Sequence, residues 1–160
     1  MLKSHLALAG VLTIALGAGA ALAAPASPLA SLAGSWSGGG TLSTSDGGQE
    51  QLRCRANYDV SGAGAAVRIN LRCASASYNF DLASEVAYNG GAISGSWSEA
   101  SRNASGTISG RANGDRIEAA ARGDNFSANL SLTTQGNRQA VSIRPQQSNV
   151  TAVSLTLQRR

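Results

Sequence analysis

Histidine and lysine are almost missing from this chain of 160 residues. The one histidine, His5, and the one lysine, Lys3, both lie near the N-terminus. A mature chain without that segment has no imidazole for a Ser-His-Asp or Cys-His mechanism, and none to ligate a metal ion. We therefore expect no enzyme, no metal and no cofactor, although catalysis by carboxylates alone stays open.

Aromatic residues are also few: two tryptophans, three tyrosines and two phenylalanines. So few rings cannot form the two interfacial girdles of an outer-membrane barrel, so we expect no membrane span in the mature chain. Positive charge is in modest excess, with 12 arginines against 9 acidic residues outside the N-terminal segment. That excess is too small to predict binding to nucleic acid.

Residues 1–23 have the pattern of a secretory signal peptide. Lys3 supplies a polar start, residues 6–20 are apolar and uncharged, and Ala21-Leu22-Ala23 is a small-x-small cleavage site. We expect a periplasmic or secreted protein with a flexible leader over residues 24–32. Residues 33–160 are then a single β domain, which we expect to be a monomer.

The mature chain alternates between apolar and polar residues, with turns rich in Gly, Asn and Asp between the alternating segments. In residues 126–133, for example, the apolar side chains of Phe126, Ala128, Leu130 and Leu132 fall on one face. Such alternation predicts an antiparallel sheet with one buried face. We predict an all-β meander of about eight to ten strands that closes, or nearly closes, into an up-and-down barrel, with a two-sheet sandwich as the alternative.

Two cysteines, Cys54 and Cys73, fall at equal distances from a Gly-rich turn near residue 63. The same register places Tyr58 opposite Ile69 on an apolar face. In an exported protein a lone pair of cysteines is normally oxidised. The sequence therefore predicts a Cys54–Cys73 disulfide between neighbouring strands.

The polar face of this hairpin carries four arginines, Arg53, Arg55, Arg68 and Arg72. The register predicts that Arg55 lies opposite Arg72, and that Asp59 forms an ion pair with Arg68. Two like charges on opposite positions repel unless an acid or a bound anion lies between them. One interpretation is pairing with Asp81 or Glu85 on the next strand. The other is a patch that binds an anion on a lipopolysaccharide, a polysaccharide or a partner protein.

The tetrapeptide Gly-Ser-Trp-Ser occurs twice and contains both tryptophans, Trp36 and Trp97. The first copy resembles the early Gly-x-Trp of lipocalin-, avidin- and fatty-acid-binding-type barrels, in which the tryptophan closes one barrel end. In size, early Gly-x-Trp and single disulfide, the chain is also similar to small periplasmic metalloprotease inhibitors and to other small exported β-barrel proteins of bacteria. Glu99 falls on the same strand face as Trp97, so Trp36, Trp97, Glu99 and Tyr58 are candidate ligand-binding residues.

Two functions fit these patterns. In the first, the protein is non-catalytic and binds a small apolar ligand or an envelope component. In the second, it is a periplasmic interaction or inhibitor protein that acts through surface loops or the arginine-bearing hairpin face. Space in the barrel interior discriminates between them, because an interior filled by side chains leaves no room for a ligand.

Overall fold

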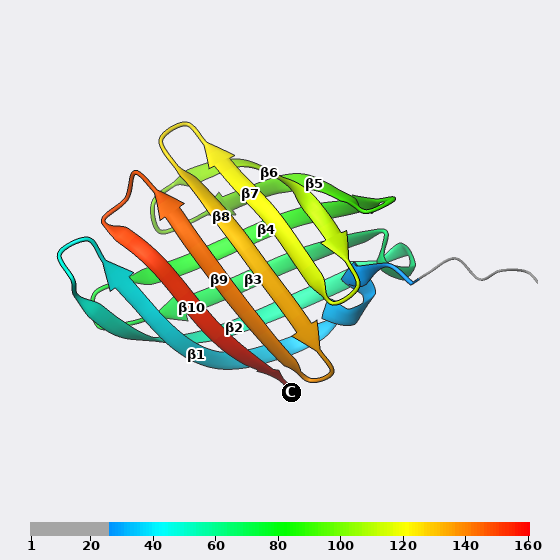
Figure 1. Ribbon diagram of the computed structural model, residues 1–160, viewed down its shortest axis with the longest axis horizontal. Coiled ribbons are helices and arrows are strands. Elements are labelled where there is room, and N and C mark those ends of the chain that lie inside the picture. The colour runs from blue at the N-terminus through cyan, green and yellow to red at the C-terminus, as the bar shows by residue number, and fades with distance from the viewer. Residues whose placement is uncertain (1–25) are drawn as a thin grey trace, which may run out of the picture.

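Ten antiparallel strands form most of residues 26–160, the part of the chain that this computed structural model describes (Figure 1). The strands are β1 (Gly34–Thr44), β2 (Gln49–Ser61), β3 (Ala66–Ala74), β4 (Asn79–Asn89), β5 (Ala92–Glu99), β6 (Ala104–Asn113), β7 (Arg116–Gly123), β8 (Ser127–Gln135), β9 (Arg138–Gln146) and β10 (Val150–Arg159). Two short 3-10 helices, η1 (Pro28–Leu32) and η2 (Gly62–Gly64), accompany them. The predicted signal peptide, residues 1–23, lies outside the described residues.

The sheet closes on itself. Each strand pairs with its neighbours in sequence, and β1 also pairs with β10. Across that last ladder Trp36 lies opposite Arg159, and Leu42 lies opposite Val153. The predicted up-and-down barrel is confirmed, and closure removes the sandwich alternative. A closed barrel leaves no strand edge open to pair with another chain.

The β2–β3 hairpin has the register that the sequence predicts. Cys54 lies opposite Cys73, and Arg55 lies opposite Arg72. The two cysteines form a disulfide on the inward face, where both are buried. The predicted disulfide is confirmed, and it is consistent with an oxidising compartment.

Helix η1 covers one end of the barrel, where it contacts β2, η2 and β6. Ser27 caps it by accepting a hydrogen bond from the Leu29 amide at 3.2 Å. Leu29 and Leu32 are almost completely buried. Within the leader that the sequence predicts to be flexible, residues 24–32, the part Pro28–Leu32 is instead a 3-10 helix anchored to the barrel by its two leucines.

Inward-facing glycines let neighbouring strands approach closely. A Cβ atom on Gly40 would lie 1.7 Å from the Ser154 carbonyl oxygen, and one on Gly95 would lie 1.9 Å from that of Glu85. Both distances are far below a van der Waals contact. These glycines thus permit the sharp curvature of a closed sheet rather than opening a cavity.

Candidate functional site

The middle of the barrel is lined by apolar side chains that are only half-buried, although they point inward. They are Ile69, Leu71, Leu82, Ile108, Ile117, Leu130, Leu132, Val141 and Ile143. In a closed barrel the uncovered surface of an inward-facing side chain faces either the interior or one of the two barrel ends. A close-packed core would cover such side chains almost fully. The interior beside β3, β4 and β6–β9 is therefore less closely packed than a filled core, and we call these side chains the inner wall.

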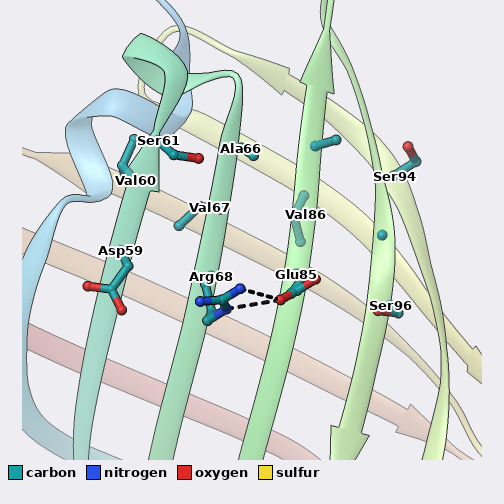
Figure 2. Close-up of a pocket in the computed structure, with 12 residues that line it drawn as sticks. Asp59, Val60, Ser61, Ala66, Val67, Arg68, Glu85, Val86, Ser94 and Ser96 are labelled. Atoms are coloured by element: carbon teal, nitrogen blue, oxygen red, sulfur yellow. Dashed lines mark hydrogen bonds and ion pairs between the residues drawn. The ribbon is translucent and has the colours of Figure 1, made fainter.

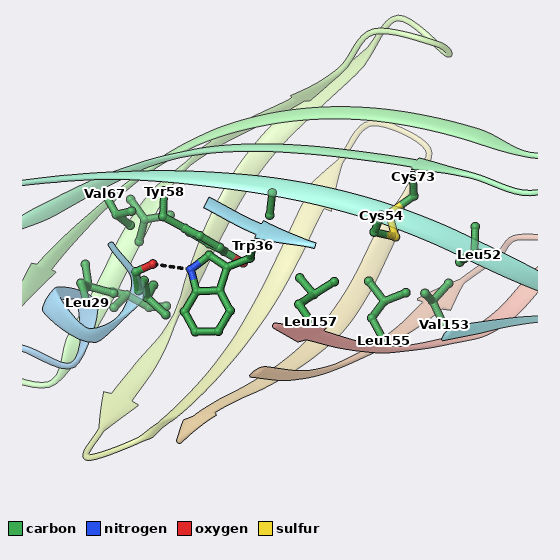
Figure 3. Close-up of a cluster of buried hydrophobic side chains, with 14 of the residues drawn as sticks. Leu29, Trp36, Leu52, Cys54, Tyr58, Val67, Cys73, Val153, Leu155 and Leu157 are labelled. Atoms are coloured by element: carbon green, nitrogen blue, oxygen red, sulfur yellow. Dashed lines mark hydrogen bonds between the residues drawn. A yellow bond between two sulfur atoms is a disulfide. The ribbon is translucent and has the colours of Figure 1, made fainter. Parts of the chain in front are cut away.

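The opposite side of the interior is filled. Leu42 on β1, Leu52 on β2 and Leu157 on β10 are at most 2% exposed. Three apolar side chains of β10 form a row beside the disulfide in Figure 3: Val153, Leu155 and Leu157. Side chains of β1, β2 and β10 are thus more completely buried than those of the inner wall.

Trp36 closes the end of the barrel next to η1. Its indole Nε1 donates a hydrogen bond to the Leu32 carbonyl oxygen at 2.8 Å (Figure 3). The Arg159 guanidinium lies 4.4 Å from the centre of the ring and also donates to the carbonyls of Ser31 and Ala33. These contacts hold the indole on two sides, so Trp36 and η1 together cover this end of the barrel.

Tyr58 reaches across the interior from β2 to β9. Its hydroxyl donates to the Gln139 side-chain oxygen at 2.8 Å, and the Gln139 amide nitrogen donates to the Thr134 hydroxyl at 3.2 Å. All three residues are buried. Burial raises the pKa of the Tyr58 phenol and outweighs the opposing effect of the Gln139 hydrogen bond, so the phenol stays neutral.

Trp97 lies on the inward face of β5 and is 6% exposed. Its ring meets Phe126 edge to face, with the ring centres 5.4 Å apart. Its indole nitrogen is buried and has no hydrogen-bond partner among residues 26–160. An unpaired buried donor is costly, so this N–H calls for an acceptor that no described residue supplies.

Glu99 shares the inward face of β5 but has its oxygens occupied. The backbone amides of Asp81, Ser101 and Arg102 donate to it at 2.9, 3.1 and 2.9 Å, and Arg102 forms an ion pair with it at 3.4 Å. Desolvation acts to raise the pKa of this carboxyl, but the hydrogen bonds and the guanidinium outweigh it and lower the pKa. Glu99 thus remains ionised and fastens the turn between β5 and β6.

Aromatic contacts narrow the end of the barrel opposite η1. Tyr78 and Phe80 stack with ring centres 6.3 Å apart, and the Arg102 guanidinium lies 4.7 Å from the centre of the Phe80 ring. The Asn149 amide, from the β9–β10 loop, donates to the Tyr78 hydroxyl at 2.8 Å. These contacts join β4 to the β5–β6 and β9–β10 loops and to the segment that precedes β4.

The four hairpin arginines all lie on the outer face and are exposed. Arg68 forms an ion pair with Glu85 at 2.8 Å, drawn in Figure 2, and Arg72 forms one with Asp81 at 3.2 Å. Asp59 instead accepts a hydrogen bond from Asn57. The predicted Asp59–Arg68 ion pair is therefore wrong. Arg68 also lies opposite Glu85 on the neighbouring strand β4, and it forms its ion pair there.

Sequence patterns missed two residues of the interior. Gln139 is the second residue of β9 and is polar, although the other inward positions of that strand are apolar. Arg159 is the last residue of β10, a strand whose other inward positions are also apolar. Both positions fall on the inward face by alternation, which could have indicated them.

Among residues 26–160 no group of acidic residues and cysteines is placed to hold a metal ion, and no helix there is long and apolar enough to cross a membrane.

No protein-family model matches the chain, and no curated protein matches it. One similar solved structure is the crystal structure of Rv2717c from M. tuberculosis, with a TM-score of 0.65 at 14% sequence identity. The match covers 86% of this chain and 98% of that one. At this identity the similarity supports the β-barrel fold alone.

Proposed function

We propose that this protein is exported to the periplasm or secreted, where it holds a small, largely apolar ligand inside its barrel without catalysis. The observation that carries the proposal is the inner wall, whose inward-facing side chains stay half-buried in a closed barrel. Export is supported by the N-terminal sequence pattern and the disulfide. The early Gly-x-Trp, which resembles that of lipocalin-type barrels, supports the same function.

The unpaired indole N–H of Trp97 favours a ligand that carries a hydrogen-bond acceptor. The nitrogen is covered by protein atoms in this structure, so an acceptor on the ligand, such as a ketone or ester, would satisfy this donor once the side chains over it move, whereas an alkane would leave it unpaired. Apolar surroundings with few polar groups are typical of small-molecule sites. The ligand class is therefore a hydrocarbon chain or ring that carries one hydrogen-bond acceptor.

Competition binding tests this ligand class. The mature protein is loaded with the apolar fluorophore N-phenyl-1-naphthylamine, which is then displaced with 2-undecanone or with undecane. We expect the ketone to bind about three- to tenfold more tightly than the alkane, because one net hydrogen bond separates them. In Trp97→Phe this preference disappears. If the wild-type protein binds neither the fluorophore nor the ketone, the proposal fails.

A cavity-filling pair of variants measures the space without any ligand. Leu130→Phe adds volume at the inner wall, and Leu157→Phe adds it at a position only 1% exposed. We expect Leu130→Phe to change the free energy of unfolding by less than about 1 kcal/mol, and Leu157→Phe to lower it by about 1–3 kcal/mol. Equal losses in both variants would mean that the interior is filled.

A further inference from the structure

The outer face of β1–β4 forms a shallow groove that the interior function does not use. The groove holds about 1380 Å³ of space. Side chains that point outward into it include Ser35, Ser37, Arg53, Arg55, Asn57, Asn70, Arg72, Asn79 and Asp81. We call it the outer groove. It is separated from the inner wall by the sheet itself, so the two sites are independent.

Positive charge is concentrated in the outer groove. Arg55 lies directly opposite Arg72, and Arg53 is two residues away on the same face of β2. These positions lie about 5–7 Å apart at the backbone. The one carboxylate that lines the groove, Asp81, pairs with Arg72. Among residues 26–160, Arg53 and Arg55 take part in no ion pair.

Some exposed arginines elsewhere on the barrel form ion pairs and others, such as Arg111, Arg122 and Arg144, form none within residues 26–160, so the outer groove is distinguished by Arg55 facing Arg72. Arg68 pairs with Glu85, and Arg116 pairs with Glu118 at 2.6 Å. At the outer groove, by contrast, two arginines face each other across a ladder and share one acid. Like charges in that position repel, and an anion bound between them would remove the repulsion.

The rest of the outer groove is polar, and its outward-facing side chains include no apolar group larger than the methyl of Ala74. Asn57, Asn70 and Ser35 present amide and hydroxyl groups, whereas the rings of Trp36 and Phe80 belong to the interior. Without an outward aromatic ring there is no platform for stacking nucleobases. Without an apolar centre the surface also lacks the core of a protein–protein interface. Amides and hydroxyls beside arginines suit a ligand with both hydroxyl groups and acids.

We propose that the outer groove binds an acidic saccharide, a sugar chain that carries carboxylate groups. The forked guanidinium groups of Arg53 and Arg55 bind carboxylates through paired hydrogen bonds. The amide of Asn70, which makes no side-chain hydrogen bond within residues 26–160, bonds a ring hydroxyl. An open groove across four strands leaves both ends of the chain free to continue.

Calorimetric titration of the mature protein with tetragalacturonic acid tests the proposal. Its fully methyl-esterified form serves as the neutral probe, and tetraglutamate serves as an anion without sugar. We expect the acid form to bind, the neutral form to bind at least tenfold more weakly, and tetraglutamate also at least tenfold more weakly. Rising salt concentration weakens binding, because the arginines are exposed.

Variants locate the site. The double change Arg53→Gln and Arg55→Gln removes two charge-assisted contacts, and we expect affinity to fall about tenfold or more per arginine. Arg144→Gln, an exposed arginine on β9, is the matched control and leaves affinity unchanged. Asn70→Ala weakens tetragalacturonate but not tetraglutamate. Circular dichroism establishes that each variant is folded.

Three outcomes overturn the proposal: no binding of tetragalacturonate, equal binding of tetraglutamate, or an equal loss in Arg144→Gln. Equal binding of tetraglutamate would reduce the outer groove to a patch that attracts any polyanion. Binding of 2-undecanone, measured on the same variants, stays at the wild-type level. The proposal for the outer groove can therefore fail while the proposal for the interior stands, and the reverse is also true.

Discussion

The hydroxyl of Tyr58 on β2 and the side-chain amide of Gln139 on β9 form a 2.8 Å hydrogen bond inside the barrel, between residues 81 positions apart in sequence. Within residues 26–160 the Tyr58 hydroxyl makes no other hydrogen bond. The Gln139 side chain makes one more, from its amide nitrogen to the Thr134 hydroxyl. This bond ties two distant strands together through the interior.

Tyr58→Phe removes the donor and leaves the buried Gln139 oxygen unpaired. We expect the free energy of unfolding to fall by about 1–3 kcal/mol, measured by urea denaturation. The matched control is Tyr88→Phe on β4. The Tyr88 hydroxyl makes no hydrogen bond within residues 26–160, so its removal should lower the free energy of unfolding far less. A similar loss in both variants would show that the cross-barrel bond adds nothing.

Removing the disulfide should destabilise the barrel. Cys54 and Cys73 are separated by 19 positions, and a loop of that length contributes about 3 kcal/mol on the chain-entropy model. We expect the Cys54→Ala, Cys73→Ala double variant to lose about that much in urea denaturation. Added reductant should shift the wild-type midpoint and leave the double variant where it is, which controls for other effects of the reductant.

Glu99 should make stability depend on pH. Its pKa in the folded state lies below the ordinary value of 4.5, so the ionised group stabilises the fold above that pH. This contribution is lost as the pH falls through the folded-state pKa. The stability advantage of wild type over Glu99→Gln, clear at neutral pH, should therefore shrink on acidification.

Glu118→Gln supplies the comparison for that experiment, since Glu118 is exposed and pairs only on the surface. Its effect on unfolding should be small at every pH. If the Glu99→Gln difference stayed constant from neutral to acidic pH, the carboxylate would not be the group that fastens the β5–β6 turn.

Gly40→Ala should strain the ladder between β1 and β10, because its Cβ would lie 1.7 Å from the Ser154 carbonyl oxygen. The strands would have to separate, and we expect a loss of about 1–3 kcal/mol in the free energy of unfolding. Thr41→Ala, the next residue on the outward face, should cost less. Thermal unfolding of the two variants gives the comparison directly.

The sequence predicts those features that depend on neighbouring strands. The positions of Cys54 and Cys73 about one turn determine the whole register of their hairpin, and alternation determines which side chains point inward. The sequence leaves a closed barrel and a two-sheet sandwich both open, and the β1–β10 ladder decides between them. The partner of Arg68 was missed because two acids flank it on adjacent strands, and the sequence does not rank them.

Features that cross the interior could not be predicted in the same way. Tyr58 and Gln139 meet only because the closed sheet curves β2 toward β9, and nothing local in either strand specifies the other. The role of Glu99 also depends on distant backbone amides, such as that of Asp81. Whether the inner wall is covered depends on the barrel's width, which alternation does not determine.

The pairing of β1 with β10 also sets an order of assembly. Every other ladder joins strands that follow each other in sequence, so each of these hairpins can form as soon as its second strand has been synthesised. The ladder between Gly34–Thr44 and Val150–Arg159 must wait for the final strand. Until then β1 and the newest strand both present unpaired edges, and we expect the long-range closure that removes them to be the slowest step of folding.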